Sequence, residues 1–182
     1  MIELQVRGVR GHLFTVCLEA QSELHPKEVA RELNEVLEQG EWVSVVSRCD
    51  MLPPENVLVS TAMYALRAYA SGSMISRGVE IELLLYLLGE RNVNKVLSLL
   101  ASSPSKLLGL VCLTTRDPMG LTRKLESFAA SRGFKLRKYE EGGWVDFFAE
   151  YLGVSAVSRD LLYERVVGAL RARAALLCLT AQ

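Results

Sequence analysis

Apolar and polar residues alternate along the first twenty positions and predict two strands. The segments "IELQVRG" at 2–8 and "HLFTVCLEA" at 12–20 place an apolar side chain at nearly every second position. Shorter strands are predicted at 42–48 and at 134–139, the latter near a sheet edge because its polar face is basic. The run "LLGLVCLTT" at 107–115 is apolar throughout, which is typical of a buried central strand.

A helical spacing of apolar residues marks most of the remaining chain. Pro26 suits the first turn of a helix at 25–40, and Gly40 suits its end. Asn92 and Asp117 are suitable N-caps for two later helices. Because strands and helices mix without strict alternation, we expect one α+β or mixed α/β domain over residues 1–182, with a central mixed sheet of about four to five strands flanked by helices. Further helices are predicted at 54–72, 76–92, 92–101, 117–133, within 142–153, and from 158 to at least 170.

The most apolar helix carries acids near its start. Val79 to Leu88 are apolar except for Glu80 and Glu82, and Gly89 follows. With Ser73 or Ser76 as N-cap, both acids fall in the first turns, where the helix dipole favours them. The apolar residues surround almost the whole circumference, so we expect this helix to be buried on most sides.

Composition and charge limit the classes of partner. The chain has 182 residues, half of them hydrophobic, and a formal net charge of zero. Seven acids lie between residues 19 and 41, and six bases lie between 119 and 138 against one acid. Each run is most simply a solvated helix face. Neutrality of the whole chain argues against long tracking of a nucleic-acid duplex, so no DNA partner is expected.

The four cysteines, Cys17, Cys49, Cys112 and Cys178, are far apart in the sequence. They form no pattern with zinc-ligand spacing, so we expect no metal site and reduced cysteines in the core. The N-terminus lacks a signal-peptide pattern, and no apolar stretch approaches the ~20 residues that span a bilayer. These features predict a soluble, cytoplasmic protein with no membrane contact.

Catalytic signatures are missing from the sequence. There is no phosphate-binding GxxxxGK[ST] loop and no GxSxG nucleophile motif. The two histidines, His12 and His25, have no sequence neighbour that suggests a nucleophile. We therefore expect no catalytic residues, no cofactor and no enzymatic activity. An uncharacterised small-molecule enzyme remains a rival hypothesis.

Several basic and polar residues cluster around the breaks at the two ends of the apolar helix. Arg77 precedes it and Arg91 follows it, with exposed amides expected at the start of the next helix. These groups could receive a phosphate, although basic residues alone are more often surface charges than a nucleic-acid site. Ordinary solvation is the alternative for each basic residue. The predicted set is Arg67, Ile75, Arg77, Arg91, Asn92 and Lys95.

The series from residue 57 to 101 resembles one known family. An alanine-rich helix containing Ala62, Ala65 and Leu66 is followed by a Ser/Gly break, by "VEIELLLY" and by a "GERNVNKVL" continuation. These residues are similar to those of the smallest non-catalytic subunit of the KEOPS complex, the family of the PRPK-binding protein. The order of the remaining predicted elements also fits this family, so residues 1–182 would form one domain like that subunit.

The resemblance implies a partner and a ligand. Members of this family bind the small atypical kinase/ATPase subunit of KEOPS, and archaeal members capture the single-stranded 3′ CCA end of tRNA. The assembled complex installs threonylcarbamoyl on an adenosine beside the anticodon. By this resemblance we expect the candidate residues around the helix breaks to form an RNA-binding site, in which the arginines and the lysine hold phosphates and Ile75 packs on a base. Glu90 stands where the family often has Thr or Lys, and it supports a second hypothesis, a regulator of the kinase subunit without RNA contact.

An apolar stripe on the C-terminal helix is a candidate for the kinase-subunit interface. Leu162, Val166 and Leu170 recur at helical spacing, and Arg159, Arg165 and Arg173 are available for a polar rim. The alternative is that this stripe packs on the sheet.

Overall fold

A five-stranded antiparallel sheet organises the computed structural model, which describes residues 1–140 and 142–180. Neighbouring strands follow the order β1–β2–β4–β3, and β5 also pairs with β2. The predicted central strand is therefore correct, because β4 has a partner on each side. The strands are β1 (Ile2–Val6), β2 (Val9–Leu24), β3 (Glu41–Val46), β4 (Ser105–Thr114) and β5 (Lys135–Lys138).

The long strand β2 pairs with two strands in turn, first with β1 and further along with β5. A tight turn at Arg7 and Gly8, which have φ values of 50° and 81°, joins it to β1 and sets Val6 opposite Val9. Two consecutive positive φ values are typical of a two-residue hairpin turn whose twist matches that of the strands. Further along, Val16–Glu19 of β2 pair with β5, which confirms the predicted edge position of that basic strand.

The α+β fold class and the strand number are confirmed, but the expected mixture of parallel and antiparallel pairs is wrong. Strands β2 and β3 are both antiparallel to β4, so they run in the same direction as each other. They are not neighbours, because β4 lies between them. This insertion removes the parallel pair that the chain order would otherwise have produced.

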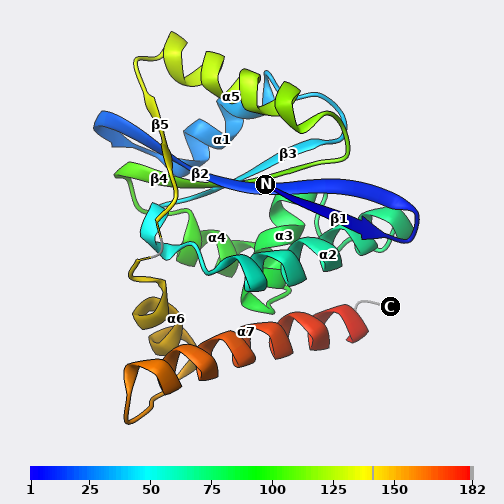
Figure 1. Ribbon diagram of the computed structural model, residues 1–182, viewed down its shortest axis with the longest axis vertical. Coiled ribbons are helices and arrows are strands. Elements are labelled where there is room, and N and C mark those ends of the chain that lie inside the picture. Colours follow the sequence, from blue (N-terminus) through cyan, green and yellow to red (C-terminus); the bar gives the residue numbers. More distant parts are fainter. Residues whose placement is uncertain (141, 181–182) are drawn as a thin grey trace.

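Helices cover both faces of the sheet, unequally. Figure 1 shows α1 and α5 on one face, and α2, α3 and α4 on the other with α6 and α7 outside them. The structure thus has one small core under α1 and α5 and one large core beneath the remaining helices. The helices are α1 (Pro26–Asn34), α2 (Glu55–Ser71), α3 (Val79–Leu88), α4 (Val93–Leu100), α5 (Pro118–Ser131), α6 (Trp144–Leu152) and α7 (Arg159–Thr180), with a 3₁₀ turn η1 (Cys49–Met51).

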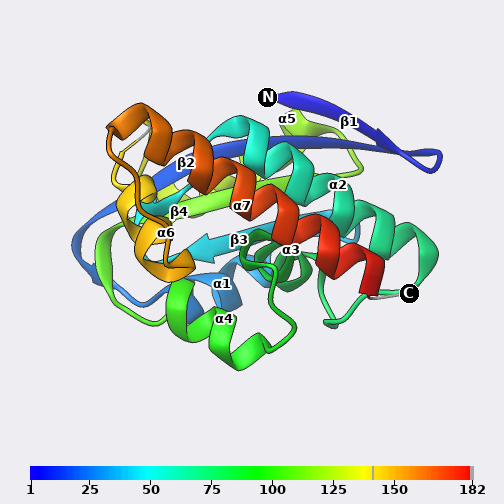
Figure 2. The same ribbon diagram turned by 90° about the horizontal axis from the view of Figure 1, so that it is seen from below.

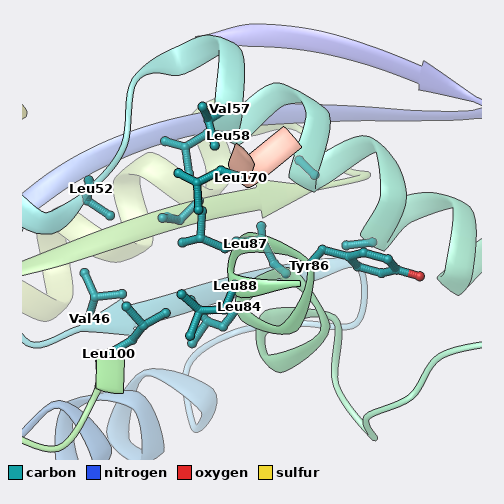
Figure 3. Packing of buried hydrophobic residues seen from close by; sticks show 14 of the residues in the cluster. Val46, Leu52, Val57, Leu58, Leu84, Tyr86, Leu87, Leu88, Leu100 and Leu170 are labelled. Carbon is teal, nitrogen blue, oxygen red and sulfur yellow. The ribbon is translucent and has the colours of Figure 1, made fainter. Parts of the chain in front are cut away.

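Helix α3 lies at the centre of the large core, as its apolar circumference predicted. Eight of its ten residues are buried, and Figure 3 shows its leucines packed among residues of α2, α4, α7 and β3. Such a helix needs cover on all sides, because its apolar residues leave no polar stripe for solvent. Among the residues that the structure describes, no helix combines the length and apolarity needed to cross a bilayer.

Helix α7 packs on α2 and α3, which separate it from the sheet (Figure 1), and Figure 2 shows it crossing them from below. Its predicted partner stripe belongs largely to the core: Val166 and Leu170 are fully buried, and Leu162 is half-buried against the same cluster. The prediction of an exposed patch is therefore wrong for Val166 and Leu170. The alternative, that this stripe packs inside the protein, is correct for these two residues. The packing surface is formed by α2 and α3, whereas we had expected the sheet.

Two predicted helix boundaries differ from the structure. Helix α1 ends at Asn34, and Gly40 instead directly precedes β3, where its carbonyl accepts a hydrogen bond from the Thr115 amide at 2.8 Å. Pairing with β4 therefore takes Gly40 away from the predicted helix end. The N-cap of α3 is Gly78, and neither Ser73 nor Ser76 has that position. The predicted N-caps Asn92 and Asp117 are confirmed, since both side chains accept amide hydrogen bonds.

The expectation of four reduced cysteines is correct for two of them. Cys112 and Cys178 are buried free thiols, whereas Cys17 and Cys49 form a disulfide with their Cα atoms 5.6 Å apart. They are 32 residues apart in the chain. Only the packing of η1 against β2 brings the two sulfurs together. Gly142 and Gly143 lie against Asp50, next to the disulfide in η1.

Candidate nucleic-acid interface

The segment between α2 and α3 is held by a buried carboxylate. Glu82 is fully buried and accepts hydrogen bonds from the amides of Ile75 and Ser76 and from the Ser76 hydroxyl, at 2.8 to 3.1 Å. A carboxylate that receives several donors in this way forms strong, charge-assisted hydrogen bonds. Glu82 therefore fixes the backbone next to Arg77, a role that the sequence analysis missed when it assigned the acid to the helix dipole.

This segment lies alongside α3 and runs in the opposite direction. Ser73 lines a cavity with Tyr86, Ile75 and Ser76 contact Glu82, and Gly78 begins the helix. Figure 1 places the segment between the end of α2 and the start of α3. Arg77 is consequently found at the N-terminal end of α3. The ten residues of α3 separate it from Arg91 by about 15 Å along the helix axis.

The other end of α3 is fixed by the C-terminal helix. Gly89 adopts a left-handed conformation with φ 60°, and Arg173 lies so close that a side chain at this position would collide with it. The Leu88 carbonyl accepts hydrogen bonds from Arg173 Nε at 3.0 Å and from the Tyr151 hydroxyl at 3.4 Å. Arg91 in turn donates to the carbonyl of Thr180. The α3–α4 turn is therefore held against α7.

A cavity of about 290 Å³ lies beside Tyr86. Its lining includes two arginines that are distant in sequence, Arg7 from the β1–β2 turn and Arg67 from α2, together with Ser71 and Ser73. In Figure 3 the ring of Tyr86 extends away from the leucines of the core with its hydroxyl outermost. Because the Tyr86 side chain is itself almost wholly buried, the groups that the cavity offers to a ligand are the two arginines and the serine hydroxyls, which suit phosphate.

Tyr86 is influenced by several charged groups around this cavity. Burial raises the pKa of Tyr86 to about 12, and the nearby Cys178 and Glu82 act in the same direction. The positive charges of Arg67 and Arg91 oppose this increase in pKa. Both arginines therefore act on the same hydroxyl, although 24 positions separate them in the chain. Tyr86 remains a neutral hydrogen-bonding group at neutral pH.

The predicted RNA-binding residues divide into separate groups. Arg67 and Arg91 are near Tyr86, and the structure adds Arg7, which the analysis of the sequence did not select. Arg77 is exposed at the far end of α3, and Ile75 is half-buried. The "VRG" turn was a signal for Arg7, since a two-residue hairpin projects its turn residue, but nothing local connected that turn with α2.

Two predicted residues are engaged within α4. Asn92 caps the helix by accepting a hydrogen bond from the Lys95 amide at 3.2 Å. The Lys95 ammonium lies 2.5 Å from Glu90, and this pairing lowers the pKa of Glu90 and raises that of Lys95. An ammonium that is already paired contributes less to phosphate binding. Lys95 is therefore a weaker candidate than Arg67 or Arg91.

The described residues contain no group of three or more His, Cys, Asp or Glu side chains that could hold a metal ion. His12 lies in β2 opposite Glu3 and Thr114, and His25 precedes α1. No family model matches this chain, and no curated protein is similar enough to be matched.

Proposed function

We propose that this protein is a non-catalytic, cytoplasmic subunit of a KEOPS-type tRNA-modification assembly, in which it binds the single-stranded 3′ CCA end of tRNA and the kinase/ATPase subunit. The observation that supports this proposal most is the cavity at Tyr86. Arg7 and Arg67 line it and Arg91 lies near it. The resemblance of residues 57–101 to the smallest KEOPS subunit supplies the identity of the ligand and the partner.

The chemistry of the cavity favours a free RNA end over a duplex. A single-stranded end offers accessible hydroxyls and a few phosphates, which match a small cavity lined by two arginines and two serines. On this proposal the protein alone neither hydrolyses ATP nor modifies tRNA, and turnover by the purified chain would contradict it.

A pair of transcripts tests the RNA part of the proposal. Binding of an intact tRNA and of the same tRNA without its CCA end would be measured by gel shift at low salt. Removal of the CCA end should weaken binding, and so should Arg91→Glu. The two losses should not add, since both remove the same contact. Equal affinity for both transcripts would exclude the CCA end as the ligand.

A regulator of the kinase subunit that does not bind RNA is the second candidate. It is favoured by Glu90, which pairs with Lys95 and reduces the positive charge beside Arg91. Co-purification with the kinase subunit in the absence of any measurable tRNA binding would favour this candidate.

A further inference from the structure

Strand β3 forms the edge of the sheet opposite β1 and β5. One hydrogen bond shows which backbone groups of β3 face β4. The carbonyl of Gly40, directly before β3, accepts a hydrogen bond from the amide of Thr115, directly after β4. Because antiparallel partners exchange hydrogen bonds at every second pair, the backbone groups of Trp42, Ser44 and Val46 point towards β4. Those of Val43 and Val45 point outwards, away from the sheet.

At the two ends of this outer edge, the outward-facing backbone amides already form hydrogen bonds within the chain. The Glu41 amide donates to the Glu38 carbonyl at 3.0 Å, and the Ser47 amide donates to the Leu100 carbonyl at 2.7 Å. Between them, the amides and carbonyls of Val43 and Val45 have no hydrogen-bond partner within residues 1–140 and 142–180. Both valines are buried, and unpaired buried backbone groups are uncommon in native proteins. The middle of the edge therefore lacks a partner strand.

A groove follows this unpaired edge. It has a volume of about 310 Å³, with Val43 to Val45 as its floor. One wall is formed by α1 through Ala30, and the other by α3 and α4 through Ile81 and Leu97. Figure 1 shows α1 on one side of the sheet, with α3 and α4 on the other. Apolar walls on both sides of a free strand edge are the arrangement that receives an added strand.

We propose that this groove binds an extended peptide segment of another protein, which adds to β3 as a sixth strand. Pairing with Val43 and Val45 requires about four residues of peptide, or roughly 13 Å of extended chain. A second copy of β3 does not fit, because it would bring its own α1 and α3 against the same walls.

Charges on the groove select the sequence of the peptide. Lys27 and Arg31 line the α1 wall, and neither forms an ion pair in the described part of the chain. Glu80 lines the opposite wall. Side chains of a strand alternate between its two faces, so the peptide should carry an acidic residue on the face towards α1 and apolar residues on the face towards Ile81 and Leu97.

Selection from a displayed library of nine-residue linear peptides tests the proposal. The bait is the full chain, and Ala30→Arg is the matched variant because Ala30 is half-exposed on the groove wall. Ala130→Arg, at an exposed alanine of α5, is the control for adding an arginine to a helix surface. We expect selected peptides to lose at least about tenfold in affinity with Ala30→Arg and to be unaffected by Ala130→Arg.

Two further measurements identify the binding mode. Every second amide of an added strand faces its partner strand. Methylation of the backbone nitrogens at one set of alternate positions in a selected peptide should therefore abolish binding, and methylation at the other set should not. Hydrogen exchange should slow at the Val43 and Val45 amides when the peptide binds, whereas the Trp42 and Ser44 amides should not change. Failure to select any peptide, or binders that are indifferent to Ala30→Arg and to methylation, would overturn the proposal. A dimer of the free chain that Ala30→Arg dissociates would identify a second copy as the occupant and overturn it equally.

Discussion

Arg132 and Arg67 come from helices on opposite faces of the same sheet, and their surroundings differ. Arg132 at the end of α5 pairs with Glu32 at 2.6 Å and lies over the ring of Phe128. Arg67 of α2 lines the cavity at Tyr86 and, among the described residues, pairs with no carboxylate. The first arginine is already neutralised, whereas the second remains available to an anionic ligand.

This contrast extends over both faces. The acidic run of residues 19–41 and the basic run of 119–138 lie against each other, joined by the ion pairs Glu19–Arg137, Glu32–Arg132 and Glu41–Lys124. The expectation that each run is a separately solvated face is corrected by this pairing. On the other face, the Glu82 carboxylate is buried in hydrogen bonds to Ile75 and Ser76, and within residues 1–140 and 142–180 neither Arg7 nor Arg67 forms an ion pair. Total charge therefore says little about where an anion can bind.

Glu82→Ala should have the largest effect on stability. It removes a buried carboxylate that accepts several hydrogen bonds and leaves the Ile75 and Ser76 amides unpaired. We expect a loss of about 2–4 kcal/mol in the free energy of unfolding, measured by urea denaturation. Glu80→Ala, two positions away in the same helix, is the control and should cost less than about 1 kcal/mol. Similar losses for both variants would contradict the role assigned to Glu82.

Lys124→Met tests the paired face and should have a smaller effect. Lys124 bonds Glu41 at 2.7 Å, and the Glu41 side chain is only 3% exposed, so the variant leaves a buried carboxylate without its cation. We expect a loss of about 1–2 kcal/mol that shrinks at high salt.

The same network predicts a pH dependence. The hydrogen bond from Lys124 and the charges of Lys124 and Arg116 lower the pKa of Glu38. The stability from this pairing is therefore present above the ordinary carboxyl pKa of 4.5 and is lost as the pH falls through the lowered value. Stability measured between neutral pH and pH about 3 should fall less steeply in Lys124→Met than in the wild type. Identical slopes would show that Lys124 does not set this dependence.

Arg67→Glu and Arg132→Glu separate the two faces by RNA binding. The first variant should weaken tRNA binding at low salt about tenfold and reduce the salt slope by about one. The second should change neither quantity, because Arg132 is neutralised by Glu32. If both variants weakened binding to the same extent, a diffuse basic surface and not the cavity would be the site.

Tyr86→Phe should change the alkaline titration and little else at neutral pH. The pKa of Tyr86 is raised from 10.0 to about 12, so any stability linked to its protonation is fully present below pH 10 and is lost as the pH rises towards 12. Of the six tyrosines, the variant should remove a late step in the ultraviolet titration. Loss of an early step instead would mean that the hydroxyl is solvated.

Local pattern was sufficient for much of the fold. The central strand, the basic edge strand, the buried helix α3 and the caps at Asn92 and Asp117 all follow from properties of neighbouring residues. Alternation, helical spacing and capping are short-range effects, so a single sequence displays them. Boundaries failed where a distant strand competed, as at Gly40, which pairs with Thr115.

The candidate site could be predicted only in part. Arg67 and Arg91 were selected from their closeness to a chain break, and they do share the surroundings of Tyr86. Arg77 was selected for the same reason and lies at the other end of α3, because the segment before α3 runs back along the helix. Arg7 was missed because a hairpin turn sixty residues away approaches α2 only in the folded chain.

By itself the sequence determined the α+β class, the burial of α3 and the identity of most helix ends, since these depend on periodicity and on groups within a few residues. The tertiary structure alone decided that Cys17 meets Cys49, that the acidic and basic runs neutralise each other, and that Val166 and Leu170 are covered by α2 and α3. It also decided that the middle of β3 has no partner. The physical reason is that each of these features depends on which distant segments pack together, and packing across the fold has no periodic signature in the chain.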